Sequence, residues 1–169
     1  RNIKVRAQEI INNQKLTNDF MKFSSGETIA GRDLEAIAIG LQEAMDQDYL
    51  HYRISSISYI GTKLLKNDIP ILQPTGGHAV YLDATLFAPH LDKSVYPAQS
   101  LACALYVRGG LRTSEIGSFM FGGINNDGKA YYADFELVRL AIPRRTYTQS
   151  HMDYVIEIII DVYKNRRKL

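Results

Sequence analysis

The sequence lacks several features that would place a protein in a class at once. A single cysteine, Cys103, excludes an intramolecular disulfide framework and any zinc site built from several cysteines. The 20 Lys and Arg residues nearly balance the 18 Asp and Glu residues, and a net charge of +2 gives no general field that attracts nucleic acid or anionic membranes. The most apolar stretch, Val155–Val162, is far shorter than the about 18 residues that span a bilayer. We therefore expect no nucleic-acid partner and no membrane partner.

A methionine start and a signal peptide are also missing. The chain begins at Arg1, and its first 20 residues contain no signal-peptide core, so we expect a cytoplasmic protein. Its 169 residues suit one ordinary domain, and 46% hydrophobic with 22% charged residues is a globular composition rather than a disordered or fibrous one. These values leave open whether the chain is a whole protein or the end of one.

Helical periodicity dominates the first 66 residues. Residues 1–30 predict an N-terminal helix followed by a polar connector. Apolar residues then recur at helical spacing across residues 31–66, which predicts a long linking helix, bent near Gln47 and ended by Asn67-Asp68. We expect the remaining residues, 67–169, to form a small domain.

Short strands are mixed with helices in residues 67–169. The patterns predict strands over residues 78–83, 112–116, 118–121 and 137–142, and helices over residues 98–107 and from Ser150 onward. Asn125–Gly128 has hairpin-turn chemistry, and Ser150-x-x-Asp153 has the spacing of a helix cap. Short strands joined by hairpin-type turns, without repeated βαβ units, indicate an α+β domain with a short, mainly antiparallel sheet.

Histidine, cysteine and glycine offer little chemistry in this sequence. The histidines fall at no metal-ligand spacing, so we expect no metal site; they are His51, His78, His90 and His151. Cys103 lies in an apolar helical segment, which favours a small buried hydrophobe over a nucleophile. Gly76-Gly77 and Gly109-Gly110 lack the phosphate-loop pattern and are typical of turns.

Arg139 is the exception. Its strand alternates, so that Val138, Leu140 and Ile142 share one face while Arg139 lies on the other. An arginine in the middle of a strand, between apolar neighbours, needs a partner. One alternative is an internal ion pair with Asp or Glu, and the other is a set of donors that binds a carboxylate or phosphate. The pattern by itself leaves both alternatives open.

Several consecutive segments resemble one enzyme family. They are AGRDLEA (30–36), QPTGGHAVYLDA (73–84), YPAQSL (96–101), EIGS (115–118) and LVRLAIPRRTYTQSHMD (137–153). In this order and spacing they resemble the C-terminal part of the β-eliminating lyases, the family of tryptophanase and tyrosine phenol-lyase. The resemblance covers nearly the whole chain from about residue 30.

The resemblance implies a pyridoxal-phosphate enzyme of fold type I, in which this chain forms the end of the large domain and much of the small C-terminal domain. Family members are homotetramers that use a monovalent cation. They cleave tryptophan or tyrosine into indole or phenol, pyruvate and ammonia, with the cofactor as the electron sink. The implied partners are an aromatic amino acid substrate, the remainder of the lyase and further copies of the same chain.

Three residues of this chain match family positions that contact the substrate. Arg139 falls where the family binds the substrate carboxylate. Ile116 and Ser114 fall where the family lines the ring pocket. Tyrosine phenol-lyases have an arginine at the position of Ile116, so isoleucine favours an apolar pocket that accepts indole, whereas Ser114 replaces an apolar residue of the family.

The family segments that hold the cofactor have no match in this chain. The cofactor lysine belongs to a Lys-Lys-Asp segment that is absent here, and the phosphate loop, the catalytic tyrosine and the cation ligands precede the matched segments in the family. We therefore expect no catalytic, cofactor-binding or metal-binding residue in this chain, and no activity of the chain alone. The alternatives are a stand-alone, non-catalytic α+β module for association or ligand binding, and a small α+β domain in which Arg139 pairs with an internal acid.

Overall fold

The computed structural model describes residues 30–143 and 146–169. Its contacts divide the chain into two units, Arg1–Tyr52 and Arg53–Leu169. The helix and connector predicted for residues 1–30 lie outside the described residues, apart from Ala30. The second unit contains the described strands, and therefore every residue singled out for substrate binding.

Two helices replace the single long helix predicted for residues 31–66. α3 spans Gly31–Glu43, and α4 spans Gln47–Leu65 and crosses from the first unit into the second. The interruption has a local cause, because the side chain of Asp46 accepts a hydrogen bond of 2.8 Å from the backbone N–H of Tyr49. A carboxylate in this position caps the start of a new helix. The break therefore falls just before the bend predicted at Gln47.

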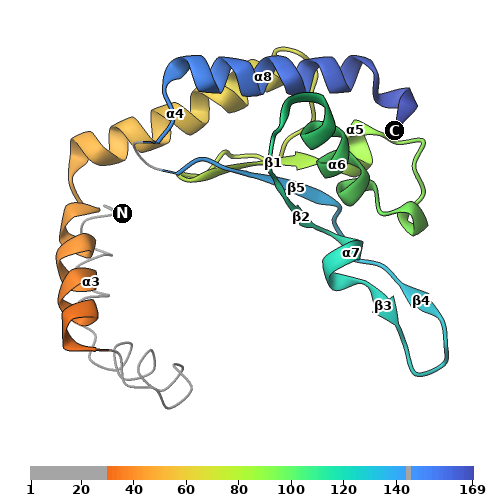
Figure 1. Ribbon diagram of the computed structural model, residues 1–169, viewed down its shortest axis with the longest axis horizontal. Coiled ribbons are helices and arrows are strands. Elements are labelled where there is room, and N and C mark those ends of the chain that lie inside the picture. The colour runs from red at the N-terminus through yellow and green to blue at the C-terminus, as the bar shows by residue number, and fades with distance from the viewer. Residues whose placement is uncertain (1–29, 144–145) are drawn as a thin grey trace. The chain divides into compact units, whose positions relative to one another are not determined.

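A three-stranded antiparallel sheet forms the centre of the second unit (Figure 1). The middle strand is β5, Leu137–Ala141, with β1, Ala79–Asp83, on one side and β2, Ser114–Ile116, on the other. β1 pairs along the whole of β5, and β2 pairs with its first three residues. A separate two-stranded hairpin is made of β3, Gly123–Ile124, and β4, Ala130–Tyr131.

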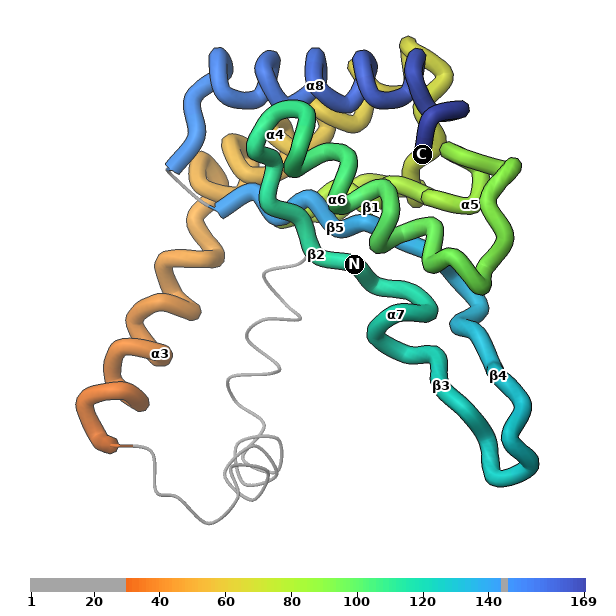
Figure 2. Tube along the Cα trace, turned by 45° about the vertical axis from the view of Figure 1, so that its right-hand side comes forward, coloured from red at the N-terminus to blue at the C-terminus, as the bar shows by residue number. Residues whose placement is uncertain are grey.

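Helices gather on one face of the three-stranded sheet (Figures 1 and 2). Buried residues of α4, of α6 (Pro97–Gly109) and of α8 (Gln149–Lys164) form one apolar cluster with Val138 and Leu140 of β5. The other elements of this unit are α5 (Ala84–Phe87), α7 (Ser118–Phe121) and the 3-10 turns η1 (Lys93–Val95) and η2 (Arg166–Lys168). Among the described residues, no helix is long and apolar enough to cross a membrane.

The α+β class predicted from the sequence is confirmed by this mixture of helices and small antiparallel sheets. The strands β1, β2 and β5 lie within their predicted ranges. The turn of the hairpin forms at Asn125, whose side-chain oxygen accepts the N–H groups of Asp127 at 3.1 Å and Lys129 at 2.9 Å. α6 ends as predicted at a glycine, because Gly110 has φ 67°, a left-handed value that other residues rarely adopt.

One predicted strand is wrong. Residues 118–121 form the helical turn α7. The carboxyl groups of Glu136 and Glu115 accept the backbone N–H groups of Ser118 and Phe119, so these donors start a helix instead of joining a strand ladder.

Two side-chain predictions are also wrong. The cap of α8 is formed by Thr148 and His151 rather than from Ser150: the backbone N–H of Thr148 donates to Nδ1 of His151 at 3.2 Å. Cys103 is exposed, although it was predicted to be buried. The buried residues of α6 recur at helical spacing on its other side, and this turns the thiol outward.

Candidate functional site

The face of the sheet opposite the helices carries all three residues predicted to bind the substrate. Arg139 of β5 lies between Tyr81 of β1 and Ser114 of β2 in one cross-strand row. Two residues along β5, Leu137 lies opposite Ile116. Directly opposed residues of antiparallel strands point to the same side, and so do alternate residues of one strand. The register therefore places these side chains on one face.

The apolar residues of β5 determine which way Arg139 points. Val138 and Leu140 are only 0% and 5% exposed, and both pack in the core. Burial of such a side chain contributes about 1.5–3 kcal/mol. A register shift by one residue would exchange them with Arg139, so the core holds the arginine on the opposite face.

Arg139 has a donor without an acceptor. Its Nε atom is buried and makes no hydrogen bond. The ion pairs found within residues 30–143 and 146–169 join Arg32 to Asp33 and Arg108 to Asp161, so the internal ion pair considered for Arg139 is not formed there. A buried donor without a partner costs about 1–3 kcal/mol, which an incoming acceptor recovers. The guanidinium is therefore suited to an anion that approaches this face.

Tyr81 belongs to the same row and was not singled out from the sequence. Its side chain is half-buried and lies directly opposite Arg139. Opposed side chains in antiparallel sheets have Cβ atoms about 4.5–5.5 Å apart, so Tyr81 is a direct cross-strand neighbour of Arg139. The strand predicted for residues 78–83 includes Tyr81, but only the pairing of β1 with β5 shows that this residue shares a face with Arg139.

Two buried carboxyl groups lie on the helix side of the sheet. Glu115 and Glu136 are 7% and 1% exposed. Oε1 of Glu136 accepts the N–H of Ser118 at 2.9 Å, and Oε2 accepts the N–H of Ala98 at 3.3 Å. Oε1 of Glu115 accepts the N–H of Phe119 at 3.2 Å, whereas its Oε2 has no partner. The two side chains therefore hold the first residues of α6 and α7.

Gly117 lies against both carboxyl groups. A Cβ atom at this position would be 2.6 Å from Oε2 of Glu136 and 2.8 Å from Oε1 of Glu115. Because both oxygens lie so close to one point, the two carboxyl groups are near neighbours. Glycine is the residue that leaves room for them.

The environment of Glu115 disfavours its charge. Burial raises the pKa of this carboxyl above its ordinary value, and the nearby charge of Glu136 raises the pKa further, while the hydrogen bond from Phe119 lowers it. The folded protein therefore keeps the Glu115 proton to a higher pH than the unfolded chain does. The resulting contribution to stability is complete below about pH 4, the ordinary range of a glutamate, and is lost as the pH rises through the raised pKa.

Glu115→Gln is expected to remove this loss, because an amide keeps the shape of the neutral carboxyl and does not ionise. The melting temperature of the variant, relative to that of the unchanged protein, should rise between about pH 4 and neutral pH. Thermal unfolding at a series of pH values measures this difference. Glu157→Gln, on the exposed face of α8, is the matched control and should show no such trend. A difference that stays constant with pH for Glu115→Gln would contradict the assignment.

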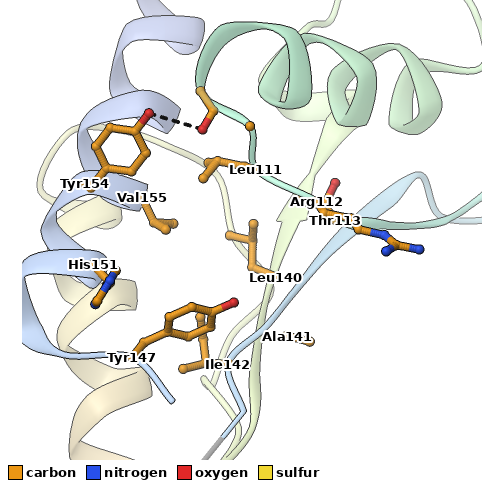
Figure 3. Close-up of a pocket in the computed structure, with 12 residues that line it drawn as sticks. Leu111, Arg112, Thr113, Leu140, Ala141, Ile142, Tyr147, His151, Tyr154 and Val155 are labelled. Atoms are coloured by element: carbon orange, nitrogen blue, oxygen red, sulfur yellow. Dashed lines mark hydrogen bonds between the residues drawn. The ribbon is translucent and has the colours of Figure 1, made fainter.

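A cavity of about 260 Å³ lies elsewhere, between β5, α8 and the loop from α6 to β2 (Figure 3). Its walls include Leu140 and Val155, and the hydroxyl of Tyr154 donates to the carbonyl of Gly109 at 3.2 Å beside it. None of the three predicted substrate-binding residues lines it. Leu140, which packs in the core on the helix side, is one of its walls.

The described residues contain no group of three or more His, Cys, Asp or Glu side chains that could hold a metal ion. The exposed thiol of Cys103 accepts a weak hydrogen bond of 3.5 Å from the side-chain amide of Gln99. Arg139 therefore offers the clearest binding chemistry of this part of the chain, and that chemistry is recognition of a carboxylate or another anion.

Comparisons with known proteins found a matching family model and several similar proteins. The family model described as beta-eliminating lyase matches residues 34–158. The tryptophanase of Salinibacter ruber is 56% identical over 151 residues, which cover 89% of this chain and 31% of that protein. The tryptophanase of Hyphomonas neptunium is 52% identical over 79% of this chain and 29% of its own length. The tyrosine phenol-lyase of Clostridium tetani is 47% identical over 83% of this chain and 31% of its own length. The chain thus spans about a third of the length of these relatives.

Proposed function

The chain belongs to the β-eliminating lyase family, and from this we propose that it is the C-terminal region of a pyridoxal-phosphate-dependent carbon–carbon lyase similar to tryptophanase. The complete enzyme, the longer polypeptide in which we place this chain, converts an aromatic amino acid into indole or phenol, pyruvate and ammonia. The chain contributes the site for the substrate carboxylate. The observation that carries the proposal is the buried, unpaired Nε of Arg139 on the sheet face opposite the helices.

The proposal includes the domain organisation and the setting of the enzyme. Residues 67–169 form the small α+β domain of a fold-type-I enzyme, residues 31–66 link it to the large domain, and residues 1–30 precede the link. The complete enzyme is a cytoplasmic homo-oligomer that uses a monovalent cation.

Arg139 binds and orients the substrate in this proposal. A guanidinium presents its donors in one plane and matches both oxygens of a carboxylate. Such a two-point contact restricts rotation of the amino acid, so that its Cα–H bond points in one direction. Tyr81 and Ser114 flank Arg139 in the row and limit its sideways movement. The role of this chain is therefore to fix the bond that the complete enzyme breaks first.

Ile116 provides the surface for the substrate ring. It lies on the face of Arg139, opposite Leu137, which is two residues along β5 from the arginine. An apolar side chain suits indole better than phenol, because a buried phenol hydroxyl needs a hydrogen-bond partner. Ser114 is small and exposed, and it leaves space between the carboxylate site and the ring surface.

The cofactor belongs to the remainder of the lyase. Pyridoxal phosphate, when bound, supplies the electron sink for negative charge at Cα. The unpaired donor of Arg139 fits the anionic end of an amino acid held at such a cofactor. No segment of this sequence matches the cofactor lysine segment of the family, so we propose that the chain alone is inactive.

The test is an assay of the complete enzyme and of the 169-residue chain, each with pyridoxal phosphate and tryptophan or tyrosine. We expect pyruvate and indole from the complete enzyme, and neither from the chain alone. Pyruvate formed by the chain alone would show that the segments without a match are not needed. A complete enzyme without activity would overturn the proposed function.

Ile116→Arg in the complete enzyme is expected to lower kcat/KM for tryptophan about tenfold or more, because it places a charge beside an apolar ring. Steady-state kinetics with tryptophan and tyrosine measure the effect. The control is Val107→Arg, since Val107 is 85% exposed on α6 and should tolerate arginine without a kinetic change. An unchanged kcat/KM in Ile116→Arg would remove Ile116 from the ring pocket.

A second candidate is a stand-alone, non-catalytic α+β module for association. Exposed apolar side chains on α7 and the hairpin favour it, and they are Phe119, Met120, Phe121, Ile124 and Tyr131. The reading frame upstream of Arg1 separates the two candidates. An in-frame cofactor lysine segment supports the lyase, and a frame without one supports the module.

A further inference from the structure

We propose that Glu115 and Glu136 are positioning residues that hold the segment Ser114–Ser118, so that Ile116 faces the ring of the substrate. This inference rests on the proposed function, because it assigns a task to residues that do not touch the substrate themselves. Both carboxyl groups lie on the helix side of the sheet, while Ile116 lies on the other side.

The hydrogen bonds of Glu136 join three parts of the chain. Its own backbone carbonyl accepts the N–H of Ala84, and its two carboxylate oxygens accept the N–H groups of Ser118 and Ala98. The start of α5, the start of α6 and the start of α7 are thereby fixed to one residue. Each N–H group at the start of a helix lacks a partner within the helix, so these bonds replace contacts with water.

Glu115 holds the same segment from within the strand. It is the middle residue of β2, and its Oε1 accepts the N–H of Phe119 at 3.2 Å. Gly117 fits between this oxygen and Oε2 of Glu136, where a Cβ atom would already be within 2.8 Å of both. The residue after Ile116 is thus enclosed, and the residue before it is tied to α7. Ile116 has little freedom to turn between two such anchors.

The two carboxyl groups divide the charge between them. Two neighbouring buried carboxylates repel each other, so one of them favours its neutral form. Both oxygens of Glu136 accept N–H bonds, which stabilise an anion, whereas Oε2 of Glu115 has no partner. The hydrogen bonds therefore favour negative charge on Glu136 more than on Glu115. An amide can replace Glu115 with little change, but at Glu136 its NH2 group would face an N–H donor.

The experiment compares an aromatic amino acid with 3-chloroalanine in the complete enzyme. Both substrates have the carboxylate and amino group, but 3-chloroalanine has no ring. We expect Glu136→Gln to raise KM for the aromatic substrate about tenfold or more, with kcat/KM for 3-chloroalanine within about twofold of its original value. The exposed control Glu157→Gln is expected to keep both values. Glu115→Gln keeps an oxygen that can accept the N–H of Phe119, so its loss should be smaller than that of Glu136→Gln.

Several results would overturn the inference. If Glu136→Gln lowers kcat/KM equally for both substrates, the role of Glu136 is purely structural. If its KM for the aromatic substrate is unchanged, Glu136 does not position Ile116. A loss in Glu115→Gln as large as in Glu136→Gln would contradict the division of charge. If Glu136→Gln does not fold, Glu136→Asp keeps the charge and shortens the side chain, and it should show the same loss for the aromatic substrate only. If the enzyme without substitutions is inactive with both substrates, the proposed function and this inference both fail. If that enzyme is active but Glu136→Gln affects both substrates equally, only this inference fails.

Discussion

Arg139→Ala in the complete enzyme is expected to raise KM for the amino acid substrate by about 30- to 1,000-fold, which corresponds to about 2–4 kcal/mol for a lost charged contact. The effect is large because the substrate carboxylate loses both its counter-charge and its two-point contact. Since Nε of Arg139 has no partner in the protein, the substitution breaks no hydrogen bond of that atom. Stability should therefore change much less than KM.

The controls separate charge from geometry. Arg139→Lys keeps the positive charge but loses the planar pair of donors. Its KM should therefore lie between the KM of the unchanged enzyme and the KM of Arg139→Ala. Arg108→Ala removes an arginine whose side chain is 61% exposed and pairs with Asp161. Exposed ion pairs contribute about 0–1 kcal/mol, so this variant should keep both KM and stability. Steady-state kinetics with tryptophan, together with thermal unfolding, measure all three variants. An unchanged KM in Arg139→Ala would remove the carboxylate role.

The sheet face on which Arg139 lies could be predicted from the sequence, because side chains alternate between the two faces along a strand. Alternation along residues 137–142 already separated Arg139 from the apolar residues that form the core. Ser114 and Ile116 are two residues apart, so one short strand places both on the same face. What the sequence could not show was the strand order, which places Tyr81 and Ser114 directly opposite Arg139 and Ile116 opposite Leu137, two residues away.

The carboxyl pair depends on contacts between distant parts of the chain. Glu136 is 38 residues from Ala98 and 18 from Ser118, and no periodicity connects them. For the same reason residues 118–121 were predicted as a strand, because their helical turn starts on these distant oxygens. The break before α4 has a nearby cause in the capping residue Asp46. The long apolar repeat around Asp46 nevertheless predicts one continuous helix, because a single capping residue changes the periodicity very little. Local alternation is thus readable from sequence, whereas partners of buried polar groups are not.

Gly117→Ala is expected to lower the free energy of unfolding by about 2–5 kcal/mol, the sum of overpacking and of weakened buried hydrogen bonds. Its φ of −164° is an extended value that any residue adopts, so the backbone itself does not require glycine. The cost comes from the added methyl group, which would lie 2.6 Å and 2.8 Å from the oxygens of Glu136 and Glu115. Neither carboxyl group can move away without breaking its hydrogen bonds to the starts of α6 and α7.

Urea unfolding of the chain measures this effect, with Gly76→Ala as the control because a Cβ atom at Gly76 has no neighbour within 4 Å. The double variant Gly117→Ala with Glu115→Ala tests the cause. Removal of the Glu115 carboxyl group removes one of the two close contacts of the methyl group, so the loss in the double variant should be smaller than the sum of the two single losses. Additive losses would mean that the contact with Glu115 does not contribute to the cost. A neutral Gly117→Ala would mean that the carboxyl groups shift freely, and then they could not position Ile116.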